Sequence, residues 1–96
     1  MTSLPRVYAD FNDLLRSPTL LRLDTRGARD DLERQGVELA AGLKVLLYDH
    51  DLDDDGNRDD LLVEGIVTRD PATGSWRAVI DPTAIRHESD EQPESN

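Results

Sequence analysis

The feature that most restricts the fold of this chain is a five-residue turn with a short apolar run on each side. The turn is Asp70-Pro-Ala-Thr-Gly74, and the runs are Leu61–Thr68 and Trp76–Ile80. Proline presets φ for a turn and glycine adopts positive φ at no steric cost, so the chain is expected to reverse direction here. Two such runs around such a turn predict a β-hairpin. Gly65, in the middle of the first run, predicts a β-bulge.

Three segments upstream of the hairpin also have the pattern of strands. Apolar and polar side chains alternate over residues 6–12 and 42–48, as in strands with one buried face, and residues 20–24 form a shorter run. Residues 26–35 predict a helix, because Thr25 precedes them as a candidate N-cap and Gly36 follows them as a candidate C-terminal stop. We therefore predict a mainly β fold: a small, twisted, five-stranded antiparallel sheet or an SH3-like barrel. The helix lies between the second and third strands.

The length and composition place this fold in one small domain. The chain has 96 residues and no cysteine, and small domains of oxidising compartments are often stapled by disulfides, so we expect a cytoplasmic protein. No apolar run exceeds three residues, and we expect no membrane-spanning segment and no membrane partner. Residues 1–87 are predicted to form the domain. Residues 88–96 have nothing to bury and are predicted to be a disordered acidic tail.

The net charge is −10, and all of the excess lies in residues 49–96. Such a charge repels phosphate backbones, so we expect no nucleic-acid binding. An acidic surface instead suits a basic protein partner.

The densest part of this charge is the stretch from Asp49 to Asp60. It includes Asp51-Leu-Asp-Asp-Asp-Gly-Asn-Arg-Asp59, in which aspartates alternate up to a glycine. Calcium prefers six to eight oxygen ligands, and a tight loop brings alternating aspartates toward one point. The stretch resembles the calcium loops of EF-hands, although Leu62 stands where their bidentate glutamate belongs. It is also similar to the loops of FG-GAP propeller repeats, which continue into Asp-Leu-Leu-Val, although that run comes one residue later here. The resemblance implies side-chain ligands at Asp51, Asp53, Asp55 and Asp59 and a backbone carbonyl ligand at Asn57.

The alternative interpretation of this stretch is a solvated acidic connector, which is the one we favour. Seven aspartates in twelve residues repel one another, and Arg58 is the one cation among them. Water screens that repulsion only if the loop stays exposed. We expect such a loop to be mobile without metal and dispensable for folding.

No motif predicts catalysis. The chain contains no glycine-rich phosphate loop and no HExxH pattern, and neither histidine has a plausible serine partner, because the serines lie in predicted turns or tails. The segments Arg6–Asn12, Leu61–Val67, Trp76–Asp81 and Ala84–His87 resemble a group of small bacterial proteins without an assigned function. That resemblance implies a stand-alone bacterial cytosolic domain and transfers no functional residue. We therefore expect a non-enzymatic protein-interaction or regulatory module, with a calcium-binding module as the alternative.

Overall fold

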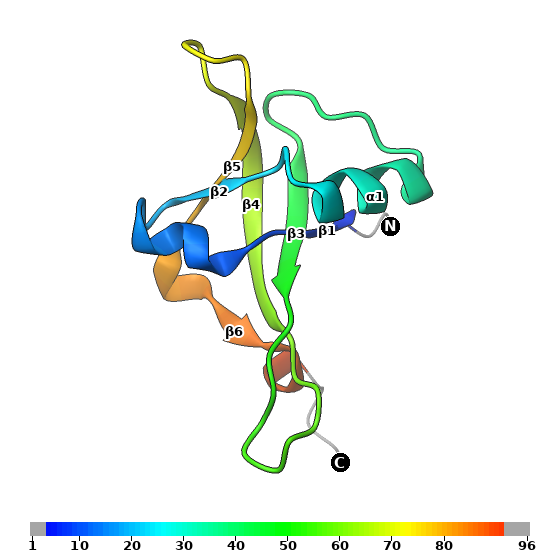
Figure 1. Cartoon of the computed structure of the whole chain (residues 1–96), viewed down its shortest axis with the longest axis vertical. Coiled ribbons are helices and arrows are strands. Elements are labelled where there is room, and N and C mark those ends of the chain that lie inside the picture. The colour runs from blue at the N-terminus through cyan, green and yellow to red at the C-terminus, as the bar shows by residue number, and fades with distance from the viewer. Residues whose placement is uncertain (1–3, 92–96) are drawn as a thin grey trace.

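The computed structural model describes residues 4–91, which form one sheet, one α-helix and three short 3-10 helices (Figure 1). The strands are β1 (Arg6–Tyr8), β2 (Leu20–Arg22), β3 (Lys44–Asp49), β4 (Leu61–Arg69), β5 (Trp76–Ile80) and β6 (Arg86–His87). The helices are α1 (Arg26–Gln35), η1 (Phe11–Leu15), η2 (Pro82–Ala84) and η3 (Glu88–Glu91). The predicted hairpin of β4 and β5 and the predicted helix α1 are both confirmed.

The sheet is open and mixed. Its order is β1-β3-β4-β5-β2, and β6 pairs with the first residues of β4. β1 runs parallel to β3, whereas the other pairs are antiparallel. The prediction of five antiparallel strands is therefore wrong in strand number and in the direction of β1. Parallel neighbours need a long connection, and η1, β2 and α1 supply it between β1 and β3. β1 and β2 end the order without pairing with each other in the described residues, so these strands do not close into a barrel.

The first strand is shorter than the predicted residues 6–12. β1 ends at Tyr8, and Asp10 starts η1 as its N-cap, because its carboxylate accepts a hydrogen bond of 2.9 Å from the amide of Asn12. Phe11 consequently lies in a 3-10 helix, from which it packs against the core. The Asp10 side chain accepts a backbone hydrogen bond of its own, and β1 therefore ends before the alternating pattern of residues 6–12 does.

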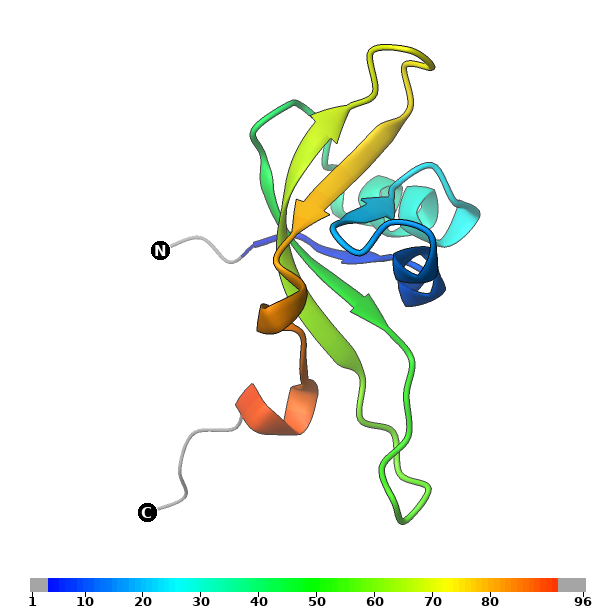
Figure 2. The ribbon, with the colours of Figure 1, turned by 90° about the vertical axis from the view of Figure 1, so that its left-hand side faces the viewer.

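Helix α1 has the predicted ends. Thr25 Oγ1 accepts a hydrogen bond of 3.3 Å from the amide of Ala28, and Gly36 adopts φ 66° after the last turn. α1 and η1 lie on the same side of the sheet (Figure 2), and Ala28 and Leu32 of α1 belong to the core. α1 has ten residues; no helix within residues 4–91 is long and apolar enough to cross a membrane.

The core explains the glycine in the middle of β4. Gly65 pairs in regular register with Val45 of β3 and Ile80 of β5, so the predicted bulge is wrong. A Cβ atom at this position would lie 2.9 Å from Leu47 Cδ1 and 3.2 Å from Ala78 Cβ. Glycine is therefore present because the sheet and the facing side chains leave no room for a methyl group.

Candidate functional site

Residues 50–60, which we call the acidic arm, connect β3 to β4 and project beyond the sheet (Figures 1 and 2). Leu52 and Arg58 form an isolated antiparallel bridge, so the arm extends the β3–β4 hairpin. Its tip turns between Asp53 and Gly56, where the amide of Gly56 donates to the carbonyl of Asp53 at 3.0 Å. Gly56 adopts φ 84°, a conformation that favours glycine. The arm is thus a defined hairpin extension.

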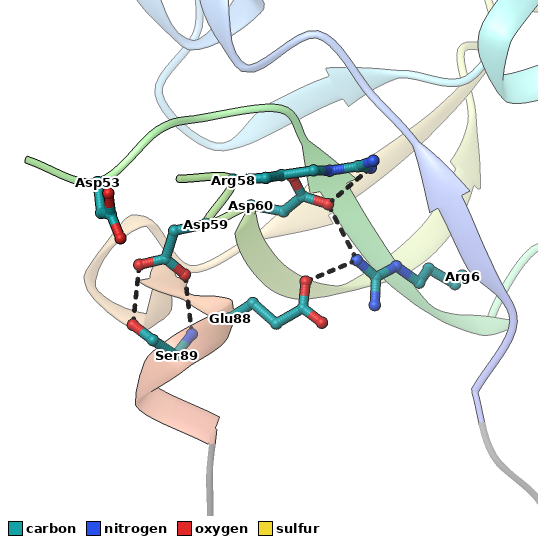
Figure 3. Close-up of a pocket in the computed structure, with 7 residues that line it drawn as sticks. All are labelled: Arg6, Asp53, Arg58, Asp59, Asp60, Glu88 and Ser89. Carbon is teal, nitrogen blue, oxygen red and sulfur yellow. Dashed lines mark hydrogen bonds and ion pairs between the residues drawn. The ribbon is translucent and has the colours of Figure 1, made fainter. Parts of the chain in front are cut away.

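The base of the arm is held by a buried carboxylate. Asp60, which precedes β4, is 1% exposed. It accepts hydrogen bonds from Arg58 Nε at 2.9 Å and Nη2 at 3.1 Å, and from Arg6 Nη2 at 3.2 Å (Figure 3). The hydrogen bonds from Arg58 hold the pKa of Asp60 below its usual range, although burial raises it. A charged group at this depth requires such partners, so Asp60 is an anchor of the fold.

Arg6 joins this anchor to two other parts of the chain. Its Nη2 also donates to Glu88 Oε1 at 3.1 Å, and its guanidinium lies 4.9 Å from the ring centroid of Tyr48 in β3. One side chain of β1 thus contacts β3, the arm and η3. Around it lies an open depression of about 610 Å³, shown in Figure 3. Its lining consists of Arg6, Asp53, Arg58, Asp59, Asp60, Glu88 and Ser89.

The C-terminal segment also bonds to the arm, at two places that together we call the clasp. Asp51 Oδ2 lies 2.8 Å from His87 Nε2, and Asp59 accepts from the amide and the hydroxyl of Ser89 at 2.9 and 2.8 Å. The hydrogen bond to Asp51 raises the pKa of His87, and the same bond lowers the pKa of Asp51. Residues 88–91, which we assigned to a disordered tail, form η3 and take part in this clasp. Residues 92–96 of that tail lie outside the described residues.

The predicted calcium ligands have separate partners. Asp51 and Asp59 bond to the C-terminal segment, while Asp53 Oδ1 accepts from the amides of Asp55 and Asn57 at 2.9 and 2.8 Å. Within residues 4–91 no three side chains of the histidine, cysteine, aspartate or glutamate type are grouped so that they could hold a metal ion. The arm in this conformation does not bring the five predicted residues around one point, and calcium binding stays a prediction.

Both ends of the acidic stretch belong to the fold, which corrects our expectation of a solvated connector from Asp49 to Asp60. Asp49 accepts from the amides of Phe11 and His50 at 2.9 and 2.8 Å, and Asp60 is buried. The structural roles of Asp49 and Asp60 were not predicted from the sequence, because both residues look like the neighbouring aspartates. One available signal was the spacing of Arg58 and Asp60, since residues two apart in an extended segment face the same side. Nothing local pointed to Arg6, which lies 54 residues away.

The serine and the histidine of the clasp do not bond to each other. The hydroxyl of Ser89 donates to Asp59, whereas His87 pairs with Asp51. In a serine–histidine pair the hydroxyl bonds to the imidazole that removes its proton, and Ser89 and His87 do not make that contact. What the arm offers instead is a set of carboxylates on a fixed hairpin, which suits an electrostatic contact with cationic groups.

Comparison of the chain with models of known protein families, with curated proteins and with solved structures gives no match.

Proposed function

We propose that this protein is a non-enzymatic interaction module that binds a basic protein partner through the acidic arm. The observation that carries the proposal is Leu52, an apolar side chain 63% exposed on the projecting arm. The exposed residues Asp54 and Asp55 lie beyond it at the tip, and their carboxylates have no hydrogen-bond or ion-pair partner among the described residues. An apolar contact with a charged rim is the usual composition of a protein interface.

The contacts that hold the base of the acidic arm favour its role as a binding surface. Asp60 and the clasp to η3 hold the hairpin before any partner arrives. A surface that is already ordered loses less conformational entropy on binding than a free loop does. Exposed carboxylates also raise the rate of encounter with a cationic surface, more than they raise the affinity, and salt weakens that attraction.

The net charge of the chain also disfavours two classes of partner. The excess of acidic residues disfavours nucleic acid and anionic membrane surfaces, because both carry dense negative charge. The absence of cysteine from the sequence supports a reducing cytoplasmic location. Both statements belong to the proposal.

Pull-down from cell lysate with the full chain tests the proposal. The arm variant carries Leu52→Ser, Asp54→Asn and Asp55→Asn, and a charge-matched control carries Asp30→Asn and Glu38→Gln, which are exposed and remote in sequence from the arm. We expect a basic protein that is retained at low salt, released at high salt, lost with the arm variant and kept with the control. A partner that both variants retain equally contradicts the use of the arm, and the lack of any salt-sensitive partner contradicts the proposal as a whole.

The non-enzymatic part of the proposal has its own test. The purified protein is expected to leave generic esterase and phosphatase substrates unchanged. Clear turnover that is lost in Asp10→Ala would overturn it, since Asp10 serves as the N-cap of η1 in the part of the chain that the structure describes.

Calcium binding through Asp51, Asp53, Asp55, Asn57 and Asp59 is the second proposal, favoured by the tight turn at Gly56. Ligation would require Asp51 and Asp59 to leave His87 and Ser89. Titration with millimolar calcium, followed by calorimetry and thermal melting, tests it. Heat together with a rise in Tm that Asp55→Ala abolishes supports the site, because a ligand of the folded state alone stabilises that state. Titration without heat and without a shift excludes it.

A further inference from the structure

A second feature, away from the acidic arm, is a small pocket in which arginines gather. It has a volume of about 160 Å³ and lies between η1, β2 and β5. Its lining consists of Asp13, Arg16, Ser17, Leu20, Arg22 and Arg77. Three guanidinium groups face one carboxylate in this lining, in a chain whose net charge is −10. The local charge is therefore opposite in sign to that of the whole molecule.

The arrangement of the strands brings two of these arginines together. Arg22 of β2 and Arg77 of β5 are direct partners in the antiparallel register. Like charges directly opposite each other on a sheet destabilise it unless something compensates them. Asp13 compensates Arg22 in part, at 3.3 Å from its Nε, and Asp70 lies 2.9 Å from Arg77 Nη2. Arg16 adds a third positive charge, and its side chain has no ion-pair or hydrogen-bond partner in residues 4–91.

Two of the lining residues also carry hydrogen-bond donors without a partner among the described residues. The Nε atom of Arg77 is buried and has no hydrogen-bond partner among the described residues. The Ser17 hydroxyl has no partner there either. A buried donor without an acceptor destabilises the folded chain, so an acceptor within reach of Arg77 Nε would stabilise it.

We propose that the pocket formed by Arg16, Arg22 and Arg77 binds an oxoanion group, of phosphate or carboxylate chemistry. The planar fork of arginine matches the oxygens of both groups. A volume of about 160 Å³ is below that of usual small-molecule pockets, about 300–1,000 Å³, and suits one anionic group. Leu20, which lines the pocket, pairs across the sheet with Val79 of β5, and Val79 pairs with Ile66 of β4. Val79 and Ile66 are 45% and 48% exposed, so an apolar surface lies beside the pocket. The remainder of the ligand is therefore expected to be apolar.

NMR titration of the ¹⁵N-labelled full chain tests the proposal through the Nε–Hε signals of its arginines. The probes are inorganic phosphate, acetate and phenyl phosphate, with sodium chloride at matched ionic strength as the reference. We expect saturable shifts of the Arg77 signal with at least one oxoanion, and none with chloride. Tighter binding of phosphate than of acetate assigns the site to a phosphoryl group, and the reverse order assigns it to a carboxylate. Phenyl phosphate is expected to bind more tightly than inorganic phosphate.

Two variants make the test specific. Arg16→Gln removes an exposed, unpartnered charge from the pocket and is expected to weaken binding about fivefold, as the loss of a charge-assisted hydrogen bond would. Arg29→Gln removes an equally exposed charge from α1 and is expected to leave the affinity unchanged. Unchanged Tm in both variants shows that each remains folded. Shifts that do not saturate, that chloride reproduces, or that Arg16→Gln and Arg29→Gln change equally would overturn the proposal.

Discussion

Replacement of Asp60 by asparagine removes the charge that anchors the acidic arm while keeping the size of the side chain. The wild-type carboxylate accepts three hydrogen bonds from Arg58 and Arg6. Loss of one partner from a fully buried ion pair costs about 3–5 kcal/mol. Arg58 and Arg6 are 64% and 39% exposed, so water recovers part of their interaction. We therefore expect Asp60→Asn to lower the free energy of unfolding by about 2–3 kcal/mol.

Urea denaturation at pH 7, with thermal melting beside it, measures this loss. For a domain of this size, about 2–3 kcal/mol corresponds to a fall in Tm of about 10–15 °C. Asp54→Asn, at the exposed tip of the arm, is the matched control, and it is expected to stay within about 0.5 kcal/mol of the wild type.

The pH dependence gives a second check on the same reasoning. The pKa of Asp60 is lowered in the folded chain, so its stabilising contribution is present above the unfolded-state pKa, about 3.9, and is lost as the pH falls through the folded-state value. The difference between wild type and Asp60→Asn should shrink on acidification below about pH 4. An Asp60→Asn variant as stable as Asp54→Asn at pH 7 would refute the role of Asp60 as an anchor.

Three further changes test other parts of the structure. Gly65→Ala places a methyl group 2.9 Å from Leu47 Cδ1 and should cost about 1–3 kcal/mol in urea denaturation; an unchanged midpoint would show that the core has room. The pKa of His87 is raised by Asp51, so their contact is complete below about pH 6.5 and weakens as the pH rises through the folded-state pKa of His87. Amide exchange in the arm should therefore quicken between pH 6 and pH 9 relative to intrinsic rates, and His87→Gln should remove that change. Replacement of residues 53–57 by Asn-Gly should preserve Tm, because it spares Asp60 and its partners; a large fall in Tm would show that the tip supports the fold.

The elements that depend on local signals were predictable from the sequence. The turn at Asp70–Gly74 and the caps at Thr25 and Gly36 act within a few residues, and each is found where it was predicted. The direction of β1 was not predictable in this way. It has three residues with one buried side chain, Val7, and that pattern is the same beside a parallel or an antiparallel neighbour.

The candidate site was predictable only in its composition. The sequence shows a dense acidic stretch, but seven similar aspartates do not reveal which one is buried. Burial of Asp60 depends on Arg6, which only the folded sheet brings within 3.2 Å. The clasp of η3 depends in the same way on contacts across 30 residues, between Asp59 and Ser89. Long-range ion pairs and hydrogen bonds of this kind leave no periodic signal in a single sequence.

The carboxylates at the margins of the open sheet have a consequence for self-association. The outward amide of Tyr8 in β1 donates to Asp31 of α1 at 2.8 Å, and the amide of Arg22 in β2 donates to Asp13 of η1 at 3.3 Å. An unsatisfied edge amide is a template on which a strand of another molecule can add. Here side chains of the same molecule take the place of that strand at both ends of the sheet. A small sheet that does not close on itself is in this way protected from edge-to-edge polymerisation, and the protection rests on two aspartates that occupy edge amides of β1 and β2.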